Sequence, residues 1–201
     1  MIAVIDYGVG NLFSLSASLN YLKIPNIITK DPAEIEKATH IILPGVGAFG
    51  DASQILRSSG LADIVIDQAK KKPLLGICLG MQLLFERGFE FGEHRGLGLI
   101  PGDVVPLADD LTTDLKVPHM GWNKLAQPIP CPILADVKPG DSVYFVHSYY
   151  AKTAPEYVVA TAEYEIPVTA MVQKGNVFGA QFHPEKSGDV GLSILKNFYK
   201  V

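Results

Sequence analysis

Apolar segments and segments of helical spacing alternate along the first half of the chain. Continuous apolar runs, which are typical of buried strands, occupy residues 2–6, 26–29, 40–43 and 73–77. Residues 11–22 place leucines three or four positions apart, and residues 51–72 show a second helical pattern with a break near Gly60. This β-α-β order predicts a parallel sheet that is covered by helices on both faces.

After about Gly98 the pattern changes to short runs separated by turn residues. We predict strands at residues 104–107, 115–118, 143–149, 158–164, 168–173 and 177–182. Lys174-Gly175-Asn176 is typical of a hairpin turn, and residues 190–199 have the spacing of a final helix. The sequence therefore predicts an α/β fold over residues 1–201, a single domain with a central, mainly parallel sheet flanked by helices and an antiparallel extension in the C-terminal half. The antiparallel strands could lengthen one edge of the sheet or stack beside it.

The composition is that of an ordinary globular protein, with 48% hydrophobic and 19% charged residues. A net charge of −4 offers no basic footprint for nucleic acid, and no apolar run approaches membrane-spanning length. No secretory pattern precedes the first strand, and the two cysteines form no disulfide scaffold. Cys131 lies in the proline-rich segment 128–132, where we interpret it as incidental. We expect a cytoplasmic protein with no nucleic-acid or membrane partner, no metal site and no cofactor.

The apolar run that ends at Cys78 carries the first chemical signal. Cys78 has one glycine two residues before it and another two residues after it, and a short helical pattern follows at once. Gly-x-Cys-x-Gly between a strand and a helix is the thiol form of the nucleophile elbow, a sharp turn that lifts the side chain above the sheet. The position at a helix N-terminus favours the thiolate form of this cysteine.

A candidate base lies far downstream, where His183 and Glu185 flank Pro184. Residues two apart on an extended chain share a face, and a proline keeps the preceding residue out of the helical region. His183 can then take the proton from Cys78 while Glu185 orients the imidazole, as in a Ser-His-Asp triad. Alone, a buried cysteine or histidine is more often structural. The two motifs together indicate a nucleophilic enzyme.

The glycine-rich segment 44–50 follows the strand at residues 40–43. Active groups gather beyond the carboxyl ends of parallel strands, so this segment is expected near the cysteine. The N–H of Leu79 and an N–H near Val46 and Gly47 are candidates for an oxyanion hole. Residues 45–50 also match the dinucleotide fingerprint Gly-x-Gly-x-x-Gly, but the match follows the third strand and lacks the later acidic residue.

With these motifs the chain resembles the class I, triad-type glutamine amidotransferases. Two segments match the nucleophile and base motifs of that family, Gly76-Ile77-Cys78-Leu79-Gly80-Met81-Gln82 and His183-Pro184-Glu185. More narrowly, the chain is similar to the glutaminase subunits of imidazole glycerol phosphate synthase. The segments that carry this closer match are residues 6–12, residues 44–50, Pro118-His119-Met120-Gly121-Trp122-Asn123 and residues 181–187. The segment 118–123 is the one that discriminates this subfamily.

The resemblance implies a reaction and a substrate. Cys78 would attack the side-chain amide of L-glutamine, ammonia would leave with a proton from His183, and water would hydrolyse the glutamyl thioester to glutamate. The same resemblance assigns glutamine binding to Gln82, Glu90 and the backbone of Ser148 and Tyr149. Within this set Glu90 would contact the α-amino group. From the sequence alone, Glu90 could equally be an ordinary surface acid.

A chain of this length has no room for a second, synthetic site, so the ammonia needs a partner that receives it. In the resembled family that partner is a (β/α)₈-barrel cyclase subunit of histidine biosynthesis. Trp122 is the only tryptophan, and we predict that it lies in a polar loop between strands. There it could be half-buried filler or an interface anchor. The resemblance favours the interface, with Tyr144 and Lys186 beside Trp122.

Three alternatives remain open at this point. A glutaminase could serve another synthase, such as an anthranilate, aminodeoxychorismate or pyridoxal phosphate synthase. A γ-glutamyl hydrolase or a cysteine peptidase could use the same triad without a partner. A dinucleotide-binding module would bind NAD and would not depend on Cys78.

Overall fold

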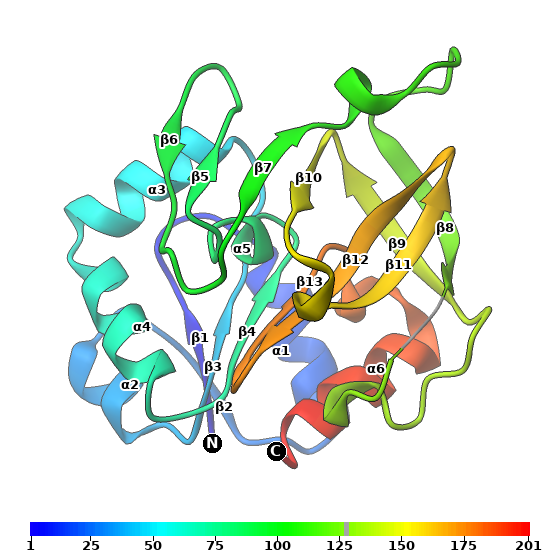
Figure 1. The fold of residues 1–201 in the computed structure, drawn as a ribbon. Coiled ribbons are helices and arrows are strands. Elements are labelled where there is room, and N and C mark those ends of the chain that lie inside the picture. The colour runs from blue at the N-terminus through cyan, green and yellow to red at the C-terminus, as the bar shows by residue number, and fades with distance from the viewer. Residues whose placement is uncertain (127–128) are drawn as a thin grey trace.

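A nine-stranded mixed sheet forms the centre of the computed structural model, which describes residues 1–126 and 129–201 (Figure 1). Within this described part the strand order is β2-β1-β3-β4-β13-β12-β11-β8-β9. The strands are β1 (Ile2–Ile5), β2 (Asn26–Thr29), β3 (His40–Leu43), β4 (Leu74–Ile77), β8 (His119–Ala126), β9 (Ser142–His147), β11 (Val158–Tyr164), β12 (Ile166–Lys174) and β13 (Val177–Ala180).

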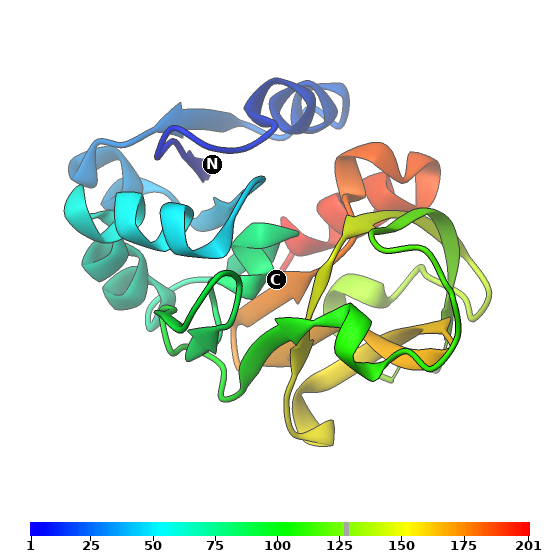
Figure 2. The ribbon, with the colours of Figure 1, turned by 90° about the horizontal axis from the view of Figure 1, so that it is seen from above.

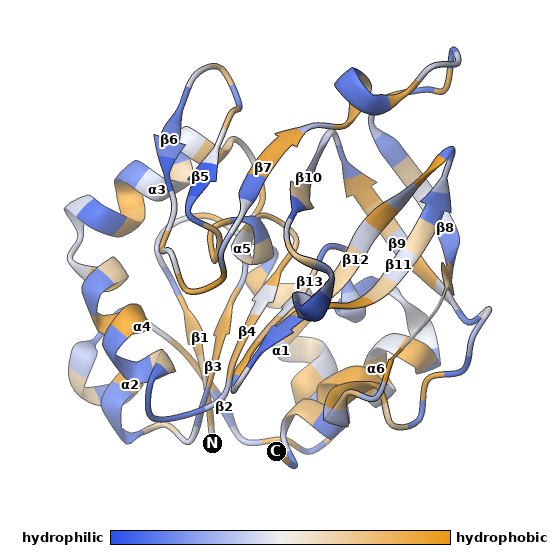
Figure 3. Cartoon of the chain, in the orientation of Figure 1, coloured by the Kyte–Doolittle hydropathy of each residue, from blue (hydrophilic) through white to orange (hydrophobic). Residues whose placement is uncertain are grey.

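The first half of this sheet is parallel, from β2 through β1, β3 and β4 to β13. Helices cover both of its faces, as the apolar runs predict (Figures 1 and 2). One layer holds α1 (Leu12–Tyr21) and α6 (Gly188–Phe198), and the other holds α2 (Pro32–Lys37), α3 (Phe49–Ser58) and α4 (Leu61–Ala69). Along β1 the side chains of Ile2 and Val4 join the first layer, and Ala3 and Ile5 join the second. This two-sided burial explains why β1, β4 and β13 are apolar throughout, whereas the edge strand β2 contains Asn26 and Thr29 (Figure 3).

Local signals explain where the helices begin and end. Asn11 caps α1 by accepting a hydrogen bond from the Ser14 N–H at 3.4 Å. Gly60 has a φ of +76° and separates α3 from α4, which confirms the predicted break. The helix α2 was not predicted from the sequence, although Asp31 caps it and Pro32 occupies its first turn, which is a recognised start signal.

The second half of the sheet is antiparallel, as predicted, and β13 joins the two halves. This strand runs parallel to β4 on one side and antiparallel to β12 on the other. The turn between β12 and β13 contains Gly175 with a φ of +60°, so the predicted hairpin is confirmed. The chain closes with α6, close to the predicted residues 190–199.

A second, four-stranded sheet is present, which is one of the two arrangements that the sequence left open for the later strands. Its order is β10-β7-β5-β6 within the described residues. Its strands are β10 (Tyr149–Lys152), β7 (Asp103–Pro106), β5 (Arg87–Gly88) and β6 (His94–Arg95). Two of these strands have only two residues each, which is too short for a hydrophobic pattern to reveal. The predicted strand at residues 143–149 is divided at Ser148 between β9 in the large sheet and β10 in the small one.

Two further expectations were wrong. Residues 115–118 form no strand and are exposed, and Pro118 has no N–H to give to a sheet. Trp122 lies in the strand β8 rather than in a loop, where it pairs with Tyr144 of β9. The exposed face of β8 carries Met120, Trp122 and Lys124, and the opposite face carries His119 and Asn123, so the strand lacks the apolar-inside, polar-outside alternation on which the prediction depended.

Both cysteines are free and buried. Of the segment around Cys131, Pro128 lies outside the described residues. In the part of the chain that is described, no helix is long and apolar enough to cross a membrane. Over the same residues, no cluster of three or more His, Cys, Asp or Glu side chains has an arrangement that could hold a metal ion.

Candidate active site

Cys78 occupies a sharp turn between β4 and the four-residue helix α5 (Leu79–Gln82). Its φ is +53°, a left-handed conformation that non-glycine residues rarely adopt and that costs on the order of 1–3 kcal/mol. The flanking glycines allow the turn because backbone crowds both of them. A methyl group on Gly80 would collide with the Leu43 carbonyl oxygen, and one on Gly76 would lie 2.6 Å from the Gly80 carbonyl oxygen. The structure therefore has the geometry of a nucleophile elbow.

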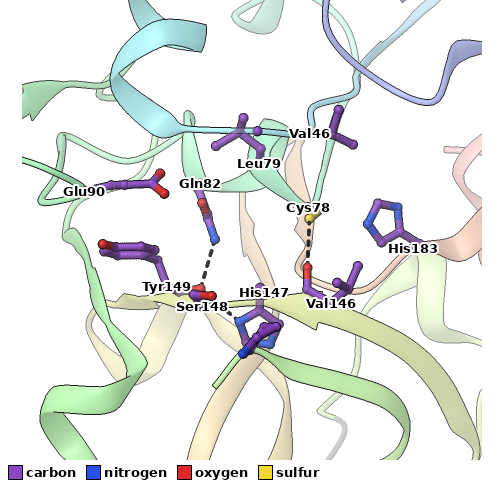
Figure 4. Close-up of a pocket in the computed structure, with 12 residues that line it drawn as sticks. Val46, Cys78, Leu79, Gln82, Glu90, Val146, His147, Ser148, Tyr149 and His183 are labelled. Atoms are coloured by element: carbon purple, nitrogen blue, oxygen red, sulfur yellow. Dashed lines mark hydrogen bonds between the residues drawn. The ribbon is translucent and has the colours of Figure 1, made fainter. Parts of the chain in front are cut away.

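His183 reaches Cys78 because β4 and β13 are neighbouring parallel strands. The Cys78 N–H donates to the Ala180 carbonyl at 2.7 Å, which ties the end of one strand to the end of the other. The backbone of His183 is itself held, since its N–H donates to the Tyr144 carbonyl at 3.0 Å and its carbonyl accepts from the Ser187 hydroxyl at 2.6 Å. Figure 4 shows the His183 ring beside the sulfur of Cys78.

Glu185 lies behind the imidazole, on the side away from the sulfur. Its Oε1 is 2.8 Å from His183 Nδ1, and both side chains are buried. A proton on Nδ1 that is donated to this carboxylate leaves Nε2 for the thiol. Burial lowers the pKa of His183, but hydrogen bonds to Cys78 and Glu185 outweigh this effect and raise the pKa to about 9. The arrangement therefore favours a protonated imidazolium between two acidic groups.

A cavity of about 310 Å³ opens in front of the sulfur (Figure 4). It brings together most of the residues that the sequence indicated, namely Val46, Gly47, Cys78, Leu79, Gln82, Glu90, Ser148, Tyr149 and His183. Cys78 and His183 lie at one end of the cavity and Glu90 lies at the other. Polar groups thus converge on both ends of a space next to a nucleophile.

Gln82 and Glu90 are both held by hydrogen bonds at the cavity wall. Gln82 Nε2 donates to the Tyr149 carbonyl at 3.0 Å and to Gln181 Oε1 at 3.0 Å. Glu90 Oε2 accepts from the Phe49 N–H at 2.7 Å, at the start of α3. A carboxylate at a helix N-terminus is electrostatically favourable, so α3 helps to hold the Glu90 side chain at the cavity.

The segment between β3 and α3 contains Val46 and Gly47 and forms another wall of the cavity. Its start is fixed by the Tyr7 hydroxyl, which donates to the Pro44 carbonyl at 2.8 Å. A methyl group on Gly45 would lie 2.7 Å from the Gly80 N, so this glycine serves close packing against the elbow. Gly47 has a φ of +94°. Close packing and a positive φ therefore explain the presence of Gly45 and Gly47 without a bound dinucleotide.

Trp122, Tyr144 and Lys186 lie together outside the cavity. The Trp122 ring is 60% exposed and meets the Tyr144 ring edge-on, with centroids 6.2 Å apart. Lys186 Nζ lies 5.8 Å from the centroid of the Tyr144 ring. Lys186 follows Glu185 directly, so this exposed cluster adjoins the histidine end of the site.

The family of the chain follows from comparison with known proteins. A family model described as glutamine amidotransferase class-I matches residues 3–201. The chain belongs to the class-I glutamine amidotransferase family.

Two curated relatives carry the name imidazole glycerol phosphate synthase subunit HisH. The one from Geobacillus sp. is 52% identical over 206 residues, covering 100% of this chain and 97% of the relative. The one from Lacticaseibacillus casei is 50% identical over 201 residues, covering 98% of this chain and 94% of the relative.

Solved structures of other proteins have the same fold as this amidotransferase. A crystal structure described as a glutamine amidotransferase superposes with a TM-score of 0.75 at 18% identity, covering 99% of this chain and 100% of that one. The predicted α/β fold, with its sheet flanked by helices, is therefore confirmed.

Sequence reasoning did not assign a role to four further residues of this candidate site. Pro118, Val146 and His147 also line the cavity, and Gln181 is wholly buried behind it. The Val146 carbonyl lies 3.9 Å from the Cys78 sulfur, and Gln181 Nε2 lies 3.8 Å from the same atom. Gln181 stands in the segment that carries His183, so a signal existed for it. Val146 lies on a strand whose alternation is typical of packing, and nothing in the pattern marks it as a site residue.

Proposed function

We propose that this amidotransferase is the glutaminase subunit of an imidazole glycerol phosphate synthase, and that residues 1–201 form one amidotransferase domain. The observation that carries the proposal is the junction of β4 and β13, where Cys78 and His183 meet over a cavity with polar groups at both ends. The relatives that are half identical over the whole chain bear the name of that synthase subunit.

In the proposed reaction Cys78 is the nucleophile. Its thiolate attacks the side-chain amide carbon of L-glutamine, and a C–S bond forms. The C–N bond then breaks, and ammonia leaves with a proton from the His183 imidazolium. Water attacks the glutamyl thioester, His183 takes a proton from that water, and glutamate leaves as the thiolate returns. Glu185 holds the imidazole in orientation throughout.

The oxyanion that forms at the amide oxygen needs donors on the side of α5. We assign this role to the N–H of Leu79 and to an N–H of the segment that contains Val46 and Gly47. Both lie at the cavity wall, and a positive φ at Gly47 marks a peptide that glycine can turn easily. Each such donor is typically responsible for about 10²–10³ in kcat.

The far end of the cavity suits the amino-acid part of glutamine. Glu90 would pair with the α-ammonium group, because one of its oxygens is taken by the Phe49 N–H and the carboxylate still faces the cavity (Figure 4). Ser148 and Tyr149 would bind the α-carboxylate through their backbone. Gln82 would hold the substrate from the wall between these groups and the sulfur.

The ammonia would pass to a partner subunit, which we propose to be a (β/α)₈-barrel cyclase of histidine biosynthesis. The cluster of Trp122, Tyr144 and Lys186 is the proposed contact, since exposed aromatic residues are common interface anchors and this cluster adjoins His183. The proposed chemistry needs a free thiol and runs on side chains and water alone. We place the complex in the cytoplasm, where thiols stay reduced.

Glutamate release from L-glutamine tests the proposal. It would be measured for the chain alone, with the barrel cyclase, and with the cyclase and its ribotide ligand. We expect a large rise in the last condition. Full activity of the chain alone would identify an independent hydrolase, and stimulation only by another synthase would reassign the subunit.

A further inference from the structure

A row of polar side chains leads from the surface of β8 to the cavity, and the reaction proposed above does not use it. Asn123 Nδ2 lies 3.2 Å from His119 Nε2, and His119 Nδ1 lies 3.1 Å from His147 Nε2. His147 Nδ1 lies 2.9 Å from the Tyr149 carbonyl oxygen. Asn123 and His119 belong to the segment 118–123 that discriminates the subfamily, while His147 lines the cavity.

Backbone groups at the two ends determine the direction of every hydrogen bond in this row. Asn123 Oδ1 accepts from the Lys124 N–H at 2.8 Å, and its Nδ2 donates to the Glu163 carbonyl at 2.8 Å, so Nδ2 must also be the donor to His119. His119 Nε2 therefore accepts, and its Nδ1 donates to His147. His147 Nε2 accepts in turn, and its Nδ1 donates to the Tyr149 carbonyl, which is only an acceptor.

Both imidazoles are buried and neutral in this arrangement. His119 is stacked between Phe145 and Tyr164, with centroids 4.7 and 4.2 Å away. Burial lowers the pKa of His119 to about 4 and that of His147 to about 3. A proton added to either ring would place two donors face to face. The row is thus a rigid support with one permitted pattern of protons.

The support acts on the backbone of Tyr149. The Tyr149 carbonyl accepts two hydrogen bonds, from His147 and from Gln82. On the preceding residue, the Ser148 carbonyl accepts from the Leu107 N–H at 2.9 Å. In an antiparallel strand the N–H and C=O of one residue point to the same side, and those of the next residue point to the other side. Because Ser148 faces β7, both backbone groups of Tyr149 point away from β7, toward Gln82 and the cavity.

We propose that His119 and His147 are positioning residues that hold the Tyr149 N–H toward the cavity, where it binds the α-carboxylate of glutamine. The inference rests on the proposed function. It gives the segment 118–123 a role inside the molecule, through His119 and Asn123, in addition to the exposed side chain of Trp122. His147 and His119 touch neither the sulfur nor the scissile amide, so they affect substrate capture and not the chemistry of the triad.

Two alkylating probes of Cys78 separate these effects. The chloromethyl ketone analogue of L-glutamine carries the α-carboxylate and α-ammonium groups, whereas iodoacetamide carries neither. The second-order rate of Cys78 alkylation would be measured by mass spectrometry for each probe. We expect His147→Phe to lower the rate with the glutamine analogue about tenfold, which is the usual effect of one lost hydrogen bond to a fixed group. The rate with iodoacetamide should be unchanged.

Two further variants keep the test decisive. His147→Asn places an amide donor near the position of Nδ1 and should recover most of the rate with the glutamine analogue. His119→Phe keeps the stack with Phe145 and Tyr164 but removes the donor to His147, and it should lower that rate about threefold. Equal rates for native chain and His147→Phe would overturn the inference, as would an equal fall with both probes. A native chain whose Cys78 is not alkylated faster by the glutamine analogue than by the same ketone lacking both α-groups would overturn the proposed function itself.

Discussion

Glu185 Oε1 lies 2.8 Å from His183 Nδ1, and each of these side chains is only 3% exposed. In this dry setting the hydrogen bond between them is stronger than it would be in water, because water does not compete for the carboxylate. The imidazole is therefore held in one tautomer, with Nε2 toward the sulfur. The raised pKa of His183 depends first on the hydrogen bond to Cys78 and then on the one to Glu185, whereas Glu185 alone holds Nδ1.

Replacing Cys78 should separate glutamine hydrolysis from synthesis. Cys78→Ala removes the nucleophile, so glutamate release by the complex should fall by at least about 10³-fold. Synthesis from added ammonium salt should stay at the native level, because the partner's chemistry does not use the sulfur. Both rates would be measured on the complex with the cyclase. Unchanged glutamine turnover in this variant would contradict the triad.

Glu185→Gln should weaken catalysis less completely and should lower the pKa of His183. The variant keeps the size of the side chain but removes the charge that stabilises imidazolium, and we expect kcat to fall on the order of 10²–10⁴-fold. The pKa of His183 would be followed by NMR titration of the free subunit. Glu156→Gln, at an exposed acid, is the matched control. A His183 titration that stays near pH 9 would show that Glu185 does not contribute to the raised pKa and would leave Cys78 as its cause.

Glu90 offers a test of substrate recognition that can be separated from folding. Glu90→Gln retains an oxygen for the Phe49 N–H but loses the charge, so KM for glutamine should rise about tenfold while the free energy of unfolding falls by only about 0.3 kcal/mol. Glu90→Ala should raise KM similarly and also lower the free energy of unfolding by about 1 kcal/mol, because α3 loses its acceptor. Steady-state kinetics and urea denaturation would measure the two effects. Equal KM values for native chain and both variants would remove Glu90 from the site.

The neutral histidines predict how stability depends on pH. A histidine whose pKa is lower in the folded state than in the unfolded state binds its proton on unfolding, so acid below about pH 6.5 favours unfolding. For His119, with a folded pKa of about 4, the loss between pH 7.5 and 5.5 should be about 1.3 kcal/mol. The free energy of unfolding of His119→Phe should therefore fall less over this range, by that amount. Parallel pH profiles for the two proteins would exclude a buried neutral His119.

Trp122→Ala should weaken the complex with the cyclase at least about tenfold if this side chain is an interface anchor. Stability of the free subunit should change little, since the ring is 60% exposed. Tyr21→Ala is the matched control, because Tyr21 is 76% exposed at the end of α1 that lies away from Cys78. Titration calorimetry would measure both affinities. A Trp122→Ala complex as tight as the control would move the interface elsewhere.

Most of the parallel half of the fold could be predicted because β1, β3, β4 and β13 are buried on both faces and are therefore largely apolar. The same reasoning did not predict β8, because its exposed face carries Met120, Trp122 and Lys124 and the strand therefore lacks a clear alternation of apolar and polar residues. The two-residue strands β5 and β6 are below the length at which periodicity exists.

The candidate site divides in the same way. Cys78 and His183 can be recognised from their neighbours in the sequence. Cys78 lies between two glycines that permit a sharp turn, and His183 precedes a proline that restricts its backbone. His147 carries no such signal, and the only one for Gln181 is its place in the segment that contains His183. Their positions depend on strand pairing between distant segments, and only the folded sheet shows that His147 faces His119 and that Gln181 faces Cys78.

The central position of β13 also sets the order in which this enzyme is completed during synthesis. The chain is made from its N-terminus, so Cys78 and its strand exist well before β13, which must enter between β4 and β12. Until then each of those two strands has an open edge, a surface that promotes wrong pairing with other chains. In the proposed mechanism, a nascent chain at this stage has the thiol of Cys78 without the base His183, so it cannot yet release ammonia from glutamine.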